Sequence, residues 1–150
     1  ISHLPKHFHL IIAGDDKNRS KLENLSLSLG INKNVTFLGH VPHEDITELY
    51  ATADIFVHPG IWPEPFGRTI LEAMQFNLPV VATNVGGPAE VIQQNKCLCE
   101  PGNPRRLAEA IEYAAQNSSK IGEQNARIVA ESYSPNNILP KIINLYQCIL

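Results

Sequence analysis

Cysteine is scarce in this sequence, positive charge is not in excess, and no long hydrophobic run occurs. Three cysteines among 150 residues argue against a disulfide scaffold and favour a reducing compartment. Twelve basic and fifteen acidic residues give a net charge of −3, without the basic surface that binds nucleic acids or anionic membranes. No apolar run approaches the roughly 18 residues of a membrane-spanning helix, and no secretory leader opens the chain. We therefore expect a cytoplasmic protein that binds no nucleic acid.

A starting methionine is also missing, because the first residue is Ile1. We therefore expect the sequence to be a piece of a longer protein. Its length and its hydrophobic fraction of 43% are enough for one domain (1–150) with a single core, and too little for two.

Short apolar runs alternate with amphipathic stretches along the whole chain. Strands are predicted at 8–13, 35–38, 55–57, 80–82 and 97–99, with helical patterns between them. The first run is nearly continuous and ends at Gly14, as expected for a strand buried on both faces. The alternation predicts an α/β fold with a doubly wound, mostly parallel sheet. In such a sheet, ligands bind beyond the carboxyl ends of the strands.

The first helix is predicted from its start signal and its periodicity. Asp15 and Asp16 follow the first strand and are expected to supply the helix cap and first-turn acids. Leu22, Leu25 and Leu29 recur at helical spacing and are expected to form the buried face. A place at the helix start explains the two acids better than a metal site does.

The segment from Glu64 to Glu72 carries the strongest chemical signal. Glu64 stands in a proline-rich loop, and Gly67 follows it where a helix is predicted to begin. Free N–H groups of a first helical turn bind anions, and a glycine lets a phosphate come close to the backbone. Glu72 lies about one turn into the helix, where a carboxylate can accept hydrogen bonds from a ribose diol. Together these features predict a site for a sugar nucleotide.

The two glutamates and their surroundings resemble the E-x7-E motif of retaining glycosyltransferases of the GT-B fold, family 4. The motif is specific here because further family matches precede and follow it in order. They comprise residues 35–39, 53–55, 72–74, 78–83, 86–92 and 101–104. The resemblance covers nearly the whole chain, and it implies the C-terminal, donor-binding half of a GT-B enzyme with a Rossmann-like fold.

The resemblance assigns a role to each part of the site. Glu64 would face the donor sugar as the catalytic residue, and Glu72 would hold the ribose. The other donor-binding residues would be backbone donors to the sugar and pyrophosphate (Phe66, Gly67, Arg68, Thr69 and Ile70), the turn that carries the base (His40 and Val41) and the end of the first strand (Gly14 and Asp15).

The implied reaction is retaining transfer of a sugar from a nucleotide sugar to an acceptor, in polysaccharide or glycoconjugate synthesis. UDP-glucose is the first choice of donor and GDP-mannose is the second. The leaving phosphate would accept the proton of the acceptor, and helix N–H groups would carry the phosphate charge. The resemblance therefore implies no metal and no other cofactor.

Two departures from the family pattern limit the expected activity. The Arg and Lys with which the family clamps the diphosphate are not found before the first predicted strand, and the acceptor-binding N-terminal domain lies outside the chain. We therefore expect an incomplete enzyme that binds donor but transfers sugar slowly or not at all. Any peripheral association with the cytoplasmic face of a membrane would come through the missing half.

Two other functions remain open. A GT-B relative such as a UDP-sugar epimerase would keep the nucleotide site without transferring sugar. A receiver-type signalling domain would use Asp15, Asp16 and Asp54, but Asp54 precedes its strand, whereas a phosphoacceptor follows one. A dinucleotide oxidoreductase is disfavoured because the first strand is not followed by G-x-G-x-x-G.

A few further residues have both a structural and a functional interpretation. Trp62 either packs against the sugar or covers the sheet edge. Gly86 and Gly87 follow a predicted strand, which favours a functional role over a plain turn. The histidines near the N-terminus and the Cys97-x-Cys99 pair have no partners at metal-ligand spacing, so they predict no metal site.

Overall fold

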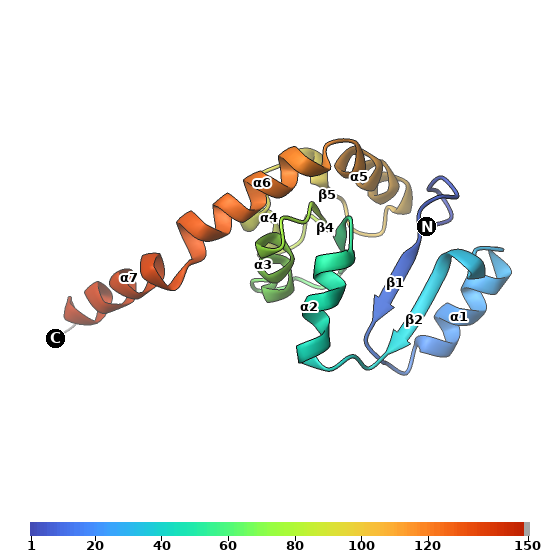
Figure 1. The fold of residues 1–150 in the computed structure, drawn as a ribbon, viewed down its shortest axis with the longest axis horizontal. Helices are drawn as coiled ribbons and strands as arrows, with labels where there is room; N and C mark the ends of the chain where they lie inside the picture. The colour runs from blue at the N-terminus through green and yellow to red at the C-terminus, as the bar shows by residue number, and fades with distance from the viewer. Residues whose placement is uncertain (149–150) are drawn as a thin grey trace. The chain divides into compact units, whose positions relative to one another are not determined.

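The computed structural model describes residues 1–148 and confirms the predicted α/β fold with parallel strands (Figure 1). The chain divides into two compact units, Ile1–Ala51 and Thr52–Leu150. The strands form two sheets, of which β1–β2 lies in the first unit and β3–β4–β5 in the second. The predicted strand positions are confirmed to within two residues at either end.

The first unit is built from two strands and their helices. Its elements are β1 (Leu10–Ala13), α1 (Arg19–Ser28), a 3-10 turn (Asn32–Asn34), β2 (Val35–Gly39) and α2 (His43–Thr52), whose last residue falls in the second unit. The two strands are parallel, and their pairing starts with Leu10 opposite Val35.

The predicted burial of β1 and α1 is wrong. Ile11 is 51% exposed, so β1 is not buried on both faces, and Leu22, Leu25 and Leu29 are 44–51% exposed. Two strand axes lie about 5 Å apart, whereas a helix with side chains is about 10 Å across. The two-stranded sheet of this unit is therefore too narrow to bury a whole helix face.

Helix α1 also starts later than its acidic residues predict. It begins at Arg19, after Asn18. The side chain of Asp16 accepts hydrogen bonds from the backbone N–H of Asn18 at 2.9 Å and from its Nδ2 at 2.7 Å. An aspartate readily bonds groups two residues further along the chain. Asp16 therefore forms a turn before the helix and does not cap it.

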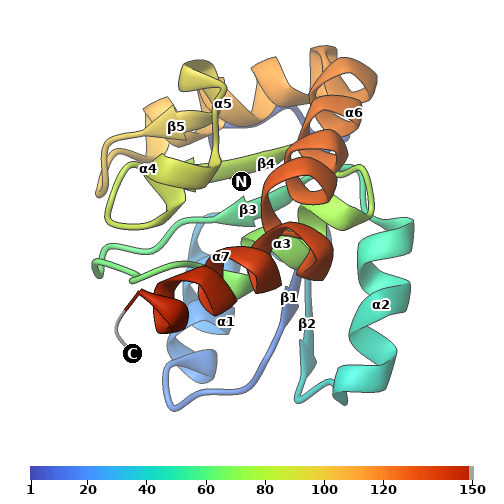
Figure 2. The ribbon, with the colours of Figure 1, turned by 90° about the vertical axis from the view of Figure 1, so that its left-hand side faces the viewer.

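The second unit places one buried strand among helices (Figure 2). Its elements are β3 (Phe56–His58), α3 (Arg68–Gln75), β4 (Val80–Thr83), α4 (Pro88–Val91), a 3-10 turn (Asn95–Cys97), β5 (Leu98–Cys99), α5 (Pro104–Gln116), α6 (Ser118–Ile128) and α7 (Pro135–Gln147). Strand β4 pairs in parallel with β3 and with β5, and all four of its residues are buried. A strand buried on both faces is expected in a parallel sheet covered by helices.

Helix α5 begins with two residues that are typical of a helix start. Pro104 is its first residue. Proline suits this position because the N–H that it lacks would have no partner within the helix, and its fixed φ is helical. The side chain of Asn103 accepts a hydrogen bond from the backbone N–H of Arg106 at 3.1 Å and so caps the helix. On its apolar face, Ala108, Ile111 and Ala114 are buried.

Helices α3 and α6 pack closely at the turn that joins α3 to β4. Asn125 is 1% exposed and donates from Nδ2 to the backbone carbonyl of Leu78 at 2.8 Å. Gly122 is buried one turn earlier on α6, against the backbone of Asn77. These contacts hold α6 against the turn that precedes β4.

Two helical segments form the end of the described chain. The α-helical part of α6 stops at Ile128, and a π-helical turn follows at Val129–Tyr133. Helix α7 starts at Pro135 and has Pro140 in its interior.

Candidate functional site

The loop and helix start between Glu64 and Glu72 have the predicted form. Gly67 has a φ of 81°, in the left-handed region that glycine adopts without strain. Helix α3 begins at the next residue, Arg68, and has no acidic residue in its first turn. Ile70, Ala73 and Met74 are completely buried and hold the helix on the sheet. The prediction of a glycine-opened helix after Glu64 is confirmed.

Two of the backbone donors expected to meet a ligand already have partners. The N–H of Gly67 donates to Oε1 of Glu64 at 3.3 Å, and the N–H of Ile70 donates to the carbonyl of Gly67 at 2.9 Å. The N–H groups of Arg68 and Thr69 stand in the first helical turn, where no carbonyl four residues earlier in the helix can accept them. The half-buried Glu64 therefore bonds back to its own loop. Arg68 and Thr69 at the start of the helix are exposed.

Glu72 lies in the second turn of α3 and is half-buried. It is eight residues after Glu64 in the sequence and belongs to the same unit. One glutamate of the motif therefore lies in the loop before α3 and the other lies within the helix.

The Glu64 loop rests on the turn that follows β4. Glu64 and Gly86 form a parallel bridge, and the N–H of Gly87 donates to the carbonyl of Glu64 at 2.8 Å. This turn belongs to the same unit as α3. Gly86 and Gly87 therefore contact the backbone of the loop that carries Glu64, and their functional role stays a prediction.

Two residues at the loop were not predicted from the sequence. Thr83 is 4% exposed, and its hydroxyl donates to the carbonyl of Gly60 and, at 3.5 Å, to that of His58. Tyr133, in the π-helical turn, meets the ring of Phe66 edge to face with centroids 5.8 Å apart. Tyr133 lies 67 positions after Phe66 and its spacing carries no signal, whereas Thr83 lies in the family-like stretch 78–83.

Trp62 is 77% exposed, like its neighbour Ile61. The side chain therefore does not cover the sheet edge, and that structural interpretation is wrong. An exposed aromatic residue in a loop with Pro59, Pro63 and Pro65 remains a candidate for contact with a sugar.

The predicted residues of the first unit gather at the carboxyl ends of its strands. The N–H of Gly14 donates to the carbonyl of Gly39 at 2.7 Å, and Asp15 is exposed. His40 is exposed and Val41 is half-buried in the segment after β2. Their contact with a nucleotide stays a prediction.

Arg19 is a basic residue at this end of the first unit that the motif did not predict. Its guanidinium pairs with Glu23 at 2.8 Å and donates to the carbonyl of Phe37 at 3.4 Å. The hydrogen bond that the guanidinium donates to Glu23 raises the pKa of Arg19. Like any arginine, it is charged at physiological pH.

Comparison with known proteins identifies the family. The family model for "Glycosyl transferases group 1" matches residues 2–134. The chain belongs to the group 1 glycosyltransferases.

Relatives and solved structures agree with this assignment. An uncharacterized glycosyltransferase of Methanocaldococcus jannaschii is 36% identical over 92% of this chain, and the lipopolysaccharide glucosyltransferase WaaG of Escherichia coli is 35% identical over 82%. The crystal structure of Anabaena HepE in complex with UDP has a TM-score of 0.89 and 28% identity over 98% of the chain, which covers 43% of HepE. HepE has also been solved with UDP-glucose, with a TM-score of 0.86.

This group 1 glycosyltransferase chain spans about a third of the length of the two sequence relatives, 36% and 33%. Within residues 1–148, no group of three or more His, Cys, Asp or Glu side chains could hold a metal ion. No helix in the described part of the chain is long and apolar enough to cross a membrane.

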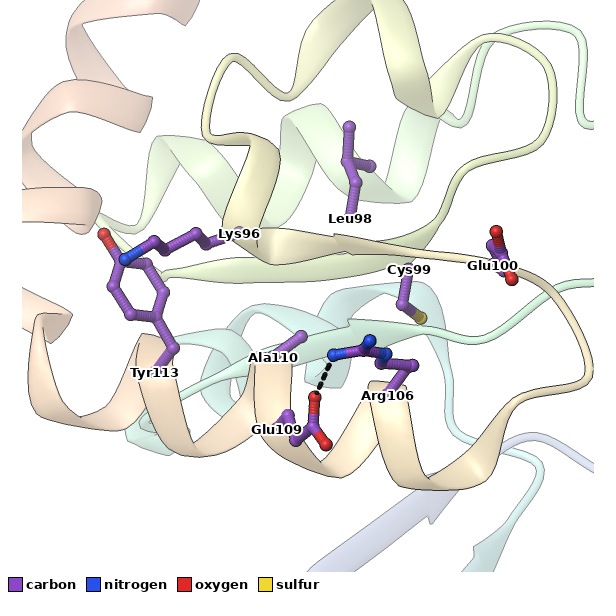
Figure 3. Close-up of a pocket in the computed structure, with 8 residues that line it drawn as sticks. All are labelled: Lys96, Leu98, Cys99, Glu100, Arg106, Glu109, Ala110 and Tyr113. Atoms are coloured by element: carbon purple, nitrogen blue, oxygen red, sulfur yellow. Dashed lines mark hydrogen bonds and ion pairs between the residues drawn. The ribbon is translucent and has the colours of Figure 1, made fainter.

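A hollow of about 510 Å³ lies elsewhere in the glycosyltransferase chain, between β5 and α5 (Figure 3). Arg106 in its wall is paired with Glu109 at 2.8 Å, and Lys96 lies over the ring of Tyr113. None of the predicted nucleotide-binding residues lines it. The hollow is therefore separate from the Glu64–Glu72 site.

The cysteines of the glycosyltransferase differ in accessibility. Burial raises the pKa of Cys97 to about 11 and also raises the pKa of Cys99, while Cys148 is exposed. Thiolates are the reactive form. At pH 8 we therefore expect iodoacetamide to modify Cys148 alone in the folded chain and all three cysteines after unfolding.

Intact mass spectrometry counts the adducts, and rapid modification of Cys97 in the folded chain would contradict its burial. The raised pKa also has a consequence for stability. The folded chain keeps the Cys97 proton to a higher pH than the unfolded chain, so the free energy of unfolding falls as the pH rises from about 9 to 11.

Proposed function

We propose that the chain is the donor-binding half of a retaining glycosyltransferase and that it binds UDP-glucose. The observation that carries the proposal is the left-handed Gly67 at the start of α3, with Glu64 before it and Glu72 after it. This arrangement offers a phosphate site, a carboxylate for a sugar and a carboxylate for a ribose in one short stretch.

The start of α3 is the proposed diphosphate site. Its first N–H groups and the helix dipole favour an anion, and no acidic residue in the first turn opposes one. The exposed Arg68 is the first residue of the helix and adds a positive charge beside it. Backbone donors explain how a chain with a net charge of −3 would bind a diphosphate.

Glu64 is the proposed catalytic residue. Its carboxylate would exchange the 3.3 Å contact with the Gly67 N–H for the hydroxyls of the donor sugar. In retaining transfer, the bond between the anomeric carbon and the diphosphate breaks, and a bond to the acceptor oxygen forms on the same face. The acceptor proton passes to the leaving diphosphate, so no protein base and no metal take part.

The choice of UDP rests on relatives and not on a base-specific contact. HepE structures contain UDP and UDP-glucose, which supports uridine nucleotides over GDP-mannose. The acceptor and the sugar linkage would be selected by a part of the enzyme outside residues 1–150.

Calorimetric titration of the 150-residue chain tests the proposal. We expect UDP and UDP-glucose to bind with dissociation constants in the millimolar range or below, with or without EDTA, and GDP-mannose to bind more weakly. Absence of uridine-nucleotide binding at millimolar concentration would contradict the proposed function. Adding the N-terminal half and an acceptor then separates sugar transfer from epimerisation, because only the latter yields an isomer of the donor.

A further inference from the structure

We propose that Gly87, with Gly86, is a positioning residue that sets the place of the Glu64–Phe66 backbone and thereby the affinity for the donor sugar. The inference rests on the proposed function and extends it, because it assigns a role to residues that do not touch the diphosphate or the ribose. It starts from the contact between the turn after β4 and the loop before α3.

The contact joins backbone to backbone. A Cβ atom at Gly87 would lie 2.6 Å from the Cα of Phe66 and 2.6 Å from the carbonyl oxygen of Pro65. A Cβ atom at Gly86 would overlap the carbonyl oxygen of Glu64 and lie 3.1 Å from its nitrogen. Backbone atoms cannot rotate away as a side-chain end can, so the loop itself would have to move.

The conformation of Gly87 does not require glycine. Its φ and ψ are −56° and −35°, which every residue adopts easily. Gly86, in contrast, has a φ of 69° and would be favoured as glycine in any turn. At Gly87, the close approach of the loop is therefore the one local reason for a residue without a side chain.

Three further contacts determine where the loop can go. The hydroxyl of Thr83 donates a hydrogen bond to the carbonyl of Gly60, and the N–H of Gly87 donates one to the carbonyl of Glu64. The ring of Tyr133 packs on the ring of Phe66. The end of β4 and the turn after it thus hold the backbone of the loop through hydrogen bonds, and the ring of Tyr133 holds the Phe66 side chain. Gly87 takes part in one of these contacts through its N–H and leaves room for the loop because it has no side chain.

Displacement of the loop would affect one part of the donor more than the rest. Glu64 and Phe66 belong to the loop, whereas Thr69 and Glu72 belong to α3, which is held by the buried Ile70 and Met74. An alanine at position 87 would therefore disturb contacts with the sugar and leave contacts with the nucleotide largely in place.

The test compares the Gly87→Ala chain with wild type and with Asn84→Ala, an exposed position in the same turn. In the unliganded chain, we expect hydrogen exchange across residues 60–67 to become at least fivefold faster in Gly87→Ala and to stay unchanged in Asn84→Ala. Binding is then measured as the ratio of the UDP and UDP-glucose dissociation constants. We expect Gly87→Ala to lower the ratio of the UDP dissociation constant to the UDP-glucose dissociation constant about tenfold. The dissociation constant of UDP itself should change less than threefold.

Unchanged exchange across 60–67, or equal losses for UDP and UDP-glucose, would overturn the inference. If wild type binds no nucleotide, the proposed function fails, and the exchange of the unliganded chains still decides whether Gly87 holds the loop. If Gly87→Ala does not fold, hydrogen exchange of the Gly87 amide in the wild-type chain tests whether Gly87 acts in donor binding. UDP-glucose should slow its exchange more than UDP does, and equal exchange with both would overturn the role.

Discussion

Replacing Gly122 by alanine is expected to lower the free energy of unfolding by about 3 kcal/mol. The new Cβ would overlap the carbonyl oxygen of Asn77 and lie 2.9 Å from its carbonyl carbon. Helix α6 would have to move away from the turn before β4, although alanine favours the helix by about 1 kcal/mol over glycine. Urea denaturation followed by circular dichroism measures the loss.

The movement of α6 would also damage a hydrogen bond one turn further along. Asn125 donates to the carbonyl of Leu78 at 2.8 Å, in a place that water does not reach. A buried carbonyl left without its donor costs about 1–3 kcal/mol. Gly122 and Asn125 therefore act on one contact, and a double variant should lose less stability than the sum of its two single variants.

Gln124→Ala is the control for this prediction, because Gln124 is exposed on the same helix. We expect its free energy of unfolding to stay within about 0.5 kcal/mol of wild type. A Gly122→Ala chain as stable as the control would show that α6 does not pack against Asn77 as described.

Replacing Glu72 by alanine is expected to weaken binding of UDP by about 10- to 100-fold, or about 1.5–3 kcal/mol, the usual range for a hydrogen bond to a charged group. The proposed partner of the carboxylate is the ribose diol, which every uridine and guanosine nucleotide shares. UDP, UDP-glucose and GDP-mannose should therefore lose affinity by similar factors. Isothermal titration calorimetry gives these values.

A nucleotide lacking one ribose hydroxyl makes the test specific. Wild type should prefer UDP to 2′-deoxy-UDP, and Glu72→Ala should bind the two equally. Gln75→Ala, at an exposed position on the same helix, should keep the wild-type preference. A Glu72→Ala chain that still discriminates between the two nucleotides would rule out a role of Glu72 at the ribose.

Local signals in the sequence predicted the elements that depend on neighbouring residues. Gly67 marks the start of α3 and Pro104 marks the start of α5, because a helix end needs particular residues within one turn. The buried strand β4 was predicted from its unbroken apolar run. The family resemblance was predicted from the E-x7-E motif and is confirmed by the match over residues 2–134.

The errors concern burial and contacts that depend on distant parts of the chain. The apolar stripe of α1 has helical spacing, but spacing does not tell whether a sheet is wide enough to cover it, and Leu22, Leu25 and Leu29 are exposed. Asp16 was predicted to cap α1, but its side chain accepts a hydrogen bond from Asn18 in a turn before the helix. Aspartate is typical both of helix caps and of such turns, so the residue type alone does not distinguish the two.

The sequence by itself determined the family, the order of strands and helices, and the glutamates that flank the α3 start, because each is written in residues close together along the chain. Only the tertiary structure decided what holds those residues in place. Gly87 contacts the loop although it lies 23 positions after Glu64, and Tyr133 contacts it although it lies 67 positions after Phe66. Such contacts follow from how the β4 turn and the C-terminal segment pack on the loop, and no local pattern encodes that packing.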